Sequence, residues 1–209
     1  MGRYTGPSCK LCRRAGTKLF LKGARCHMAK CAVDQGHPAP GVHGMRRSRK
    51  VSEYGHQLRE KQKLRQQYGM QEGQFRRFFG NALRAKGVTG ENLLQMLEMR
   101  LDNLVFRMGF AVSRQSARQF VLHKHVTVNG QTSNVPSMVL KVGDVVIVRD
   151  RSRSRDQATR AVEAATTRQL PSWLAIDPKA FRAEVLSIPT REEIGPVVEE
   201  QAIVELYSR

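Results

Sequence analysis

The spacing of apolar residues predicts two helices in the middle of the chain. Between residues 94 and 108 apolar side chains recur three and four positions apart, which is the period of one buried helix face. Gly109 follows this stripe, and glycine commonly ends helices because it adopts the left-handed conformation at little cost. An earlier stripe over residues 75–83 predicts another helix, whose phenylalanines we interpret as core because they share one face. The two stripes are Leu94, Leu97, Leu101, Leu104, Val105 and Met108, and Phe75, Phe78, Phe79, Ala82 and Leu83.

A short helix and a small antiparallel sheet are predicted to follow. Ser113 is a typical N-cap and precedes a helix that runs from Arg114 to residue 123. β-branched residues predict strands at 126–128 and 145–148, and Asn129-Gly130 is the strongest short-range signal for a tight hairpin turn. Arg114 and Arg118 lie four residues apart, so we expect them to share one exposed face of the helix.

The C-terminal quarter is predicted to extend this sheet. Segments with strand character at 173–176, 181–188 and 202–207 follow a short helix over residues 158–165. Thr190 and Glu193 fit a capping box for one helical turn between the second and third of these segments.

The charge of the chain indicates a polyanionic partner. Thirty-six lysines and arginines against 18 acidic residues give a net charge of +18. The excess is uneven, since residues 1–50 hold 12 basic residues and 1 acidic residue, whereas residues 151–209 hold nine of each. Clustered positive charge is typical of proteins that bind nucleic acid. The alternative, a membrane, is disfavoured because no apolar run approaches the roughly 18 residues that span a bilayer, and the N-terminus lacks the hydrophobic segment of a signal peptide.

The cysteines predict a structural metal site. The chain has four cysteines, arranged as Cys9-x2-Cys12 and Cys26-x4-Cys31. Two close pairs separated by a loop can wrap one tetrahedral ion, and four protein ligands leave no open position for water. Zn²⁺ is favoured over a four-iron four-sulfur cluster because the two-pair spacing resembles small zinc modules more than a ferredoxin run. His27 is an alternative ligand, and the basic residues nearby could offset the thiolate charge or face phosphate.

Motifs of catalysis are absent from the sequence. It contains no phosphate-binding loop, dinucleotide fingerprint, zinc-protease helix or nucleophile elbow. Arg100-Leu101-Asp102 matches the core of the catalytic motif in pseudouridine synthases, but Asn-Leu-Val-Phe follows it instead of Thr-Ser-Gly. We therefore interpret Asp102 as an ion-pair partner within the helical stripe and predict that the protein is not an enzyme.

The stretch from residue 99 to 148 resembles the small RNA-binding domain named after small-subunit ribosomal protein four. The resemblance rests on the runs R-L-D-N-L-V-F-R-M-G-F-A-V-S-R-Q-S-A-R-Q-F-V, V-T-V-N-G and V-G-D-V-V-I-V. It departs at Lys124, where that family usually has glycine. If the backbone there requires a positive φ, lysine costs roughly 1 kcal/mol relative to glycine.

The chain as a whole is similar to the bacterial family of small-subunit ribosomal protein four. The cysteine segment, a basic arm at residues 34–50, a helical region from Tyr54 and the ending V-E-L-Y-S-R carry this likeness. It implies a cytoplasmic protein that binds 16S rRNA at a 5′ domain junction and nucleates assembly of the small ribosomal subunit. It also implies contacts with ribosomal protein five, which influence translational accuracy, and with mRNA where the message enters the subunit. The alternative is a non-ribosomal RNA-binding regulator that carries the same domain.

Recognition of RNA is expected to depend on phosphates. RNA junctions concentrate phosphates, and clustered lysines and arginines release their counterions. The basic arm is interpreted as an RNA contact, with a solvated linker as the alternative. For His123 and His125 an RNA contact and an ordinary position at a strand edge are equally consistent with the pattern. The residues expected to contact RNA are Arg3, Arg13, Arg14, Lys22, Arg46, Arg47, Arg49, Lys50, Arg59, Lys63, Arg76, Arg107, Ser113, Arg114, Arg118, His123, Lys124, His125, Asn129 and Lys141.

These features together predict an α+β protein in three parts. Residues 1–44 form a four-cysteine metal segment with an extended arm, and residues 45–98 form a helical domain that begins with a helix from Ser52 to residue 68. Residues 99–209 form the RNA-binding domain, in which two helices and a small antiparallel sheet make a core motif at 99–150 and strands extend it C-terminally.

Overall fold

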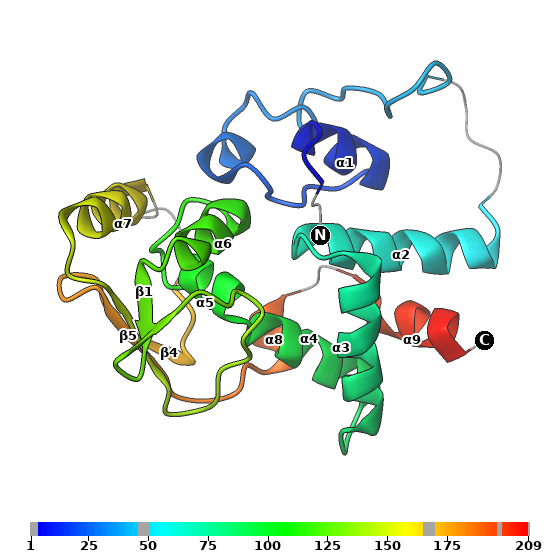
Figure 1. The fold of residues 1–209 in the computed structure, drawn as a ribbon. Coiled ribbons are helices and arrows are strands. Elements are labelled where there is room, and N and C mark those ends of the chain that lie inside the picture. Colours follow the sequence, from blue (N-terminus) through cyan, green and yellow to red (C-terminus); the bar gives the residue numbers. More distant parts are fainter. Residues whose placement is uncertain (1–3, 46–50, 165–169, 196–197, 209) are drawn as a thin grey trace. The chain divides into compact units, whose positions relative to one another are not determined.

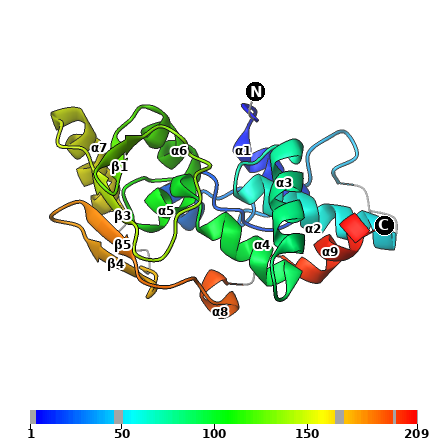
Figure 2. The same ribbon diagram turned by 60° about the horizontal axis from the view of Figure 1, so that its bottom comes forward.

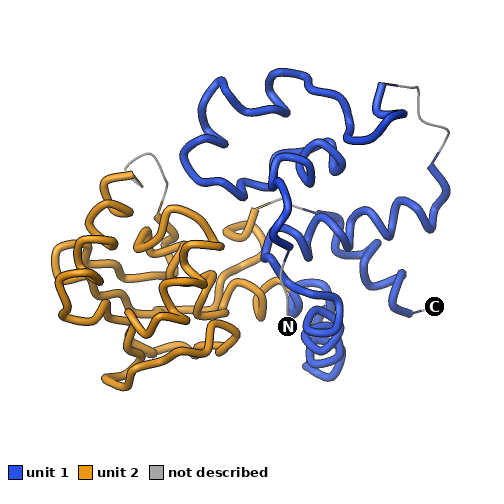
Figure 3. Tube along the Cα trace, turned by 45° about the horizontal axis from the view of Figure 1, so that its top comes forward, with its two compact units in different colours: residues 1–93, 196–209 blue, residues 94–195 orange. Residues whose placement is uncertain are grey.

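The chain divides into two units in the computed structural model, which describes residues 4–45, 51–164, 170–195 and 198–208 (Figures 1 and 3). Unit 1 comprises residues 1–93 together with 196–209, and unit 2 comprises residues 94–195. The C-terminal residues therefore group with the N-terminal part of the chain, whereas the sequence placed them in the domain at 99–209. No helix among the described residues is long and apolar enough to cross a membrane.

Helices dominate unit 1, as predicted for its central part. The helix predicted from Ser52 is present, and the Ser52 hydroxyl accepts a hydrogen bond from the backbone N–H of Gly55 at 3.2 Å. Phe75 and Phe79 are buried as expected, but Leu83 is 60% exposed, so the apolar stripe is shorter than predicted. The unit contains α1 (Ser8–Ala15), the 3-10 helix η1 (Gly23–His27), α2 (Glu53–Gln67), α3 (Glu72–Arg84), the first part of α4 (Thr89–Glu98) and α9 (Glu200–Ser208).

The prediction of a final strand at 202–207 is wrong, because this segment is helix α9 and packs against α2 (Figures 1 and 2). Ile203 is fully buried, and Tyr207, one helical turn later, stacks on Phe79 with ring centroids 4.6 Å apart. The Tyr207 hydroxyl donates a hydrogen bond to Glu72 at 2.7 Å. Burial and this hydrogen bond both raise the pKa of Tyr207, so the donor stays protonated. Short apolar runs fit either a strand or a helix, and only contacts with α2 and α3 distinguish them here.

Unit 2 is built on a five-stranded antiparallel sheet in the order β2-β1-β3-β5-β4. The α+β class is confirmed, and the predicted C-terminal extension of the sheet exists as β4 and β5, with β3 pairing to β5 through Val146 and Ala183. The Asn129-Gly130 turn has φ of 50° and 81°, the positive values that a tight hairpin between β1 and β2 requires. The strands are β1 (Val126–Val128), β2 (Gln131–Ser133), β3 (Val145–Val148), β4 (Leu174–Asp177) and β5 (Arg182–Val185).

The helices of unit 2 and the sheet share one apolar core. α5 packs on α6, and Phe110, Phe120 and Trp173 are buried with the inner strand residues. Ser113 caps α6 by accepting a hydrogen bond from the Ser116 N–H, as its sequence position predicted. The predicted capping box is also present at the start of α8. The helices that begin in unit 2 are α5 (Leu101–Arg107), α6 (Arg114–Leu122), α7 (Ser152–Ala164) and α8 (Arg191–Ile194).

The single helix predicted through residues 94–108 is wrong, because the chain is extended at Arg100 (φ −69°, ψ 137°) and separates α4 from α5. A loop covers the break and replaces the lost helical hydrogen bonds. The Leu101 N–H donates to the Met138 carbonyl at 2.8 Å, and the Leu140 N–H donates to the Met99 carbonyl at 2.9 Å. Glu98 and Asp102 lie on either side of this break, at the end of α4 and in the first turn of α5.

Candidate RNA interface

Glu98 organises the first half of a buried ionic network at the junction of α4, α5 and α6. Its side chain is 0% exposed, and its two oxygens accept paired hydrogen bonds from Arg107, both at 2.8 Å. Asn103 donates to the same carboxylate at 2.7 Å and accepts a hydrogen bond from Nε of Arg114 at 2.8 Å. Arg114 is further placed over the ring of Phe106, 4.7 Å from its centroid. A carboxylate without solvent is stable only with such complete pairing.

Asp102 organises the second half of this network. Arg100 is 1% exposed and forms a paired contact with the Asp102 carboxylate at 3.0 and 2.7 Å. The same carboxylate accepts hydrogen bonds from Arg118 at 3.2 Å and from the backbone N–H of Asn103 at 3.0 Å. The interpretation of Asp102 as an ion-pair partner is confirmed. Two carboxylates thus hold four guanidinium groups, and the network keeps a net positive charge.

Three of these arginines form what we call the guanidinium surface: Arg107, Arg114 and Arg118. The predicted face of Arg114 and Arg118 is less exposed than expected. Their side chains are only 10% and 23% exposed, and that of Arg107 is 26% exposed, because each points back to a buried partner. Each of the three side chains is still partly exposed to solvent. Contact between these arginines and RNA remains a prediction.

Lys124 and the two histidines lie at the far end of α6. Lys124 has a φ of 61°, the positive value that glycine adopts easily, so the condition under which lysine costs more than glycine is met. His123 and Lys124 are exposed, whereas His125 is half-buried, stacked on Phe120 and hydrogen-bonded through Nδ1 to the Ser154 hydroxyl at 2.8 Å. Burial lowers the pKa of His125, and the neighbouring His123, Arg151 and Arg149 lower it further. A positive environment therefore surrounds this ring.

Several other predicted contact residues have structural partners. Asn129 donates to Asp144 at 2.8 Å and accepts from the Val145 N–H at 2.9 Å, which ties the hairpin turn to β3. Arg13 and Arg14 donate to the carbonyls of Pro38 and Pro40, holding the following loop to α1. Lys63 pairs with Glu60, and Ser113 serves as the cap of α6. Lys22, Arg59, Arg76 and Lys141 are exposed. Arg3, Arg46, Arg47, Arg49 and Lys50 lie outside the described residues.

The four cysteines gather in the N-terminal segment without forming a ready metal site. Cys12, Cys26 and Cys31 are buried and Cys9 is half-buried. The Lys22 N–H lies 3.4 Å from the Cys26 sulfur. Burial raises the pKa of Cys12, a hydrogen bond from Leu19 opposes this, and Cys26, Cys9 and Cys31 raise it further. The thiols thus influence one another, but no group of three or more His, Cys, Asp or Glu within the described ranges has a metal-binding arrangement.

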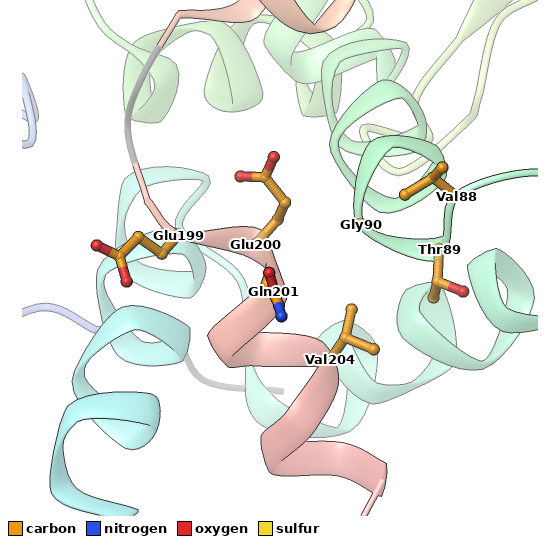
Figure 4. A pocket seen from close by; sticks show the side chains of 7 residues that line it. All are labelled: Val88, Thr89, Gly90, Glu199, Glu200, Gln201 and Val204. Carbon is orange, nitrogen blue, oxygen red and sulfur yellow. The ribbon is translucent and has the colours of Figure 1, made fainter. Parts of the chain in front are cut away.

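The pocket of unit 1 does not suit RNA. It measures about 570 Å³ and is lined by α4 and α9, with Gly90 on one wall and Glu199 and Glu200 on the other (Figure 4). A Cβ at Gly90 would lie 2.7 Å from Cγ of Glu200, so the close approach of the two walls requires glycine. The residues that line the pocket include two carboxylates and no basic side chain, and a polyanion would be repelled.

Two residues of the network were missed by sequence reasoning. Glu98 and Asn103 hold Arg107 and Arg114, yet neither was singled out. A signal existed, because Glu98 lies on the apolar stripe itself, four residues after Leu94 and three before Leu101. A charged residue on an otherwise buried face indicates a buried ion pair.

Comparisons with known proteins cover the whole chain. A family model described as "Ribosomal protein S4/S9 N-terminal domain" matches residues 3–98, and one described as "S4 domain" matches residues 99–146. The chain is 54% identical over 209 residues to small ribosomal subunit protein uS4 of Heliobacterium modesticaldum, with 100% of both chains covered. It is 56% identical to the protein of the same name in Natranaerobius thermophilus, again over 100% of both chains.

Proposed function

The chain belongs to the uS4 family of small ribosomal subunit proteins, and from this premise we propose that it is held on ribosomal RNA by its guanidinium surface. It is a structural constituent of the small ribosomal subunit in the cytoplasm, where it binds rRNA. We expect no catalytic activity of its own. The full-length match to curated relatives is the observation that carries this function.

The ionic network supports the role given to the guanidinium surface. Arginine presents a planar fork of donors that matches phosphate oxygens in pairs. An arginine already held by a buried carboxylate has lost much of its side-chain freedom, so phosphate binding costs less ordering entropy. The two carboxylates and four arginines of the network leave excess positive charge at α5 and α6. This arrangement favours recognition of the RNA backbone by shape and charge.

The proposed partners follow the family. We propose that the chain binds 16S rRNA at a junction in the 5′ domain and nucleates assembly of the subunit body. It also contacts ribosomal protein five, with an influence on translational accuracy, and faces mRNA where the message enters the subunit. The basic run at residues 46–50, which lies outside the described residues, is the part of the chain with the charge for the mRNA contact.

Integral membership of the subunit is tested by a high-salt wash. We expect the tagged chain to sediment with small subunits and to remain there after the wash, since a protein assembled into folded RNA is held by many contacts at once. A factor that associates only loosely with ribosomes serves as the control for the wash. Release of the chain together with that control would favour the alternative, a non-ribosomal RNA-binding regulator.

We further propose that Cys9, Cys12, Cys26 and Cys31 hold one structural Zn²⁺, with a four-iron four-sulfur cluster as the alternative. The spacing of the pairs, the burial of three thiols and the N–H close to the Cys26 sulfur support this. The thiolates would draw together as the metal binds, because metal binding and local folding are commonly coupled. With four protein ligands the metal would have no open coordination position, so its role would be purely structural.

Metal content distinguishes these two cofactors. Elemental mass spectrometry of anaerobically purified protein is expected to give about one zinc per chain and no visible absorption band, as a closed four-ligand site requires. Cys12→Ser should lower the zinc content, whereas an exposed substitution in the same segment, Thr17→Ser, should leave it unchanged. About four irons per chain with a brown colour would establish the cluster instead. Absence of both metals would contradict the proposal.

A further inference from the structure

We propose that the turn after α6, the connector between β3 and α7 and the first turn of α7 form a second phosphate-binding surface for RNA. We call it the connector surface and define it as His123, Lys124, Arg149, Arg151 and Arg153. The inference rests on the proposed function, since it concerns the same RNA. It adds Arg149, Arg151 and Arg153 to the residues that the sequence predicted to contact RNA.

Backbone and side-chain hydrogen bonds bring the two segments of the connector surface together. The Arg149 N–H donates to the His125 carbonyl at 2.9 Å, and Nη1 of Arg149 donates to the Lys124 carbonyl at 3.3 Å. The hydrogen bond between His125 and Ser154 joins the turn to the first turn of α7. Residues some 25 to 29 positions apart in sequence are therefore held side by side.

The positive charge of the connector surface is not neutralised within the described part of the chain. Asp150 is the acidic residue of the connector, and it pairs with Arg155 at 2.9 Å. The ion pairs among described residues include none that joins Lys124, Arg149, Arg151 or Arg153 to a carboxylate. Burial contributes most to the lowered pKa of His125, and His123, Arg151 and Arg149 lower it further because they disfavour another positive charge beside them.

The backbone conformation at Lys124 indicates that the positive charge of its side chain has a role at this position. Its φ of 61° is a conformation that disfavours residues with a Cβ, and glycine would adopt it without strain. The chain nevertheless places an exposed lysine at this position. α6 has nine residues, so the connector surface lies about 13 Å along the helix from the Arg114 end. The chain therefore offers phosphates two separate contacts, one at each end of α6.

RNA fits this surface better than an acidic protein does. Guanidinium groups pair with phosphate oxygens through parallel hydrogen bonds, and RNA supplies a row of phosphates to several cations at once. Exposed cations such as these act mainly by releasing the counterions of the RNA, so the binding affinity should depend measurably on salt concentration. An acidic protein partner is the other outcome of the test.

Lys124→Gly separates binding from folding because it is expected to change the two in opposite directions. The substitution removes one charge and the backbone strain together, so the urea midpoint of unit 2 should rise while RNA affinity falls severalfold. Arg151→Ala should weaken binding without raising the midpoint. For each variant the slope of log affinity against log salt should fall in magnitude by about 0.7–0.9. Binding of the full chain to a 16S 5′ domain transcript over a series of KCl concentrations measures both quantities.

Lys179→Ala is the matched control, since Lys179 is an exposed residue of unit 2 in the turn between β4 and β5. It removes the same charge and should keep the parent's affinity and slope. Parent-like binding by both Lys124→Gly and Arg151→Ala would overturn the connector surface while leaving the proposed function intact. Failure of the parent chain itself to bind the transcript would overturn the proposed function. Variants that bind the transcript normally but leave assembled subunits would identify a protein contact, and that result also overturns the proposal.

Discussion

Replacing Glu98 by glutamine is expected to lower the free energy of unfolding of unit 2 by about 3–5 kcal/mol, the range for breaking one side of a buried ion pair. The Glu98 side chain is 0% exposed and bonds Arg107 and Asn103 at once. Glutamine keeps the shape but removes the charge, and its amide group would face the guanidinium with donors against donors. Urea unfolding followed by fluorescence of Trp173 measures the effect, because this is the single tryptophan and is buried in unit 2.

A matched control separates the ionic network from a general change in charge. Glu192→Gln alters the net charge equally at an exposed position of α8, in the same unit, and should change stability by no more than about 0.5 kcal/mol. Equal stabilities of the Glu98→Gln and Glu192→Gln variants would show that the network contributes nothing to the fold of unit 2.

Replacing Arg114 and Arg118 together by alanine should weaken binding to a 16S rRNA 5′ domain transcript by about 100-fold, since two charge-assisted hydrogen bonds contribute about 1.5 kcal/mol each. The salt slope should fall in magnitude by about 1.5, because two phosphate contacts are lost. Filter binding at several KCl concentrations gives both values. An unchanged salt slope would remove these arginines from the RNA surface.

The structure calls for a second variant beside that double substitution. Removal of Arg118 leaves Asp102 with fewer partners, so lost binding could reflect a loosened fold. Arg114→Lys with Arg118→Lys keeps both charges but loses the planar fork. This variant should keep the salt slope of the parent chain and lose only part of the affinity. The fluorescence of Trp173 then shows whether each variant is folded in the buffer of the binding assay, which contains no urea.

The guanidinium surface explains why a strongly basic chain still needs buried acids. Of its 18 acidic residues, Glu98 and Asp102 are among those with least exposure, and both serve arginines. Flexible cations bind a polyanion non-specifically, whereas fixed ones also recognise its shape. The buried acids therefore fix the orientation of the arginines, and the excess of lysine and arginine attracts the polyanion.

Local sequence was sufficient where neighbouring residues supply the interaction. Ser113 caps α6, Asn129-Gly130 forms the hairpin turn, and Thr190 with Glu193 makes the capping box of α8, all as predicted. Each of these features uses hydrogen bonds or dihedral angles that span only a few residues. The resemblance to the family also came from the sequence, because it rests on short runs of residues in a fixed order along the chain.

Only the tertiary structure decided features whose partners are distant along the chain. The break at Arg100 depends on a loop at residues 136–140, and helix α9 depends on Phe79 and α2. Spacing alone predicted an exposed face for Arg114 and Arg118, since a helical period shows which residues share a face but not what lies opposite it. The sequence thus determined the family, the caps, the turns and most elements, while the structure decided how charges are paired, because burial and pairing arise only when separate segments meet.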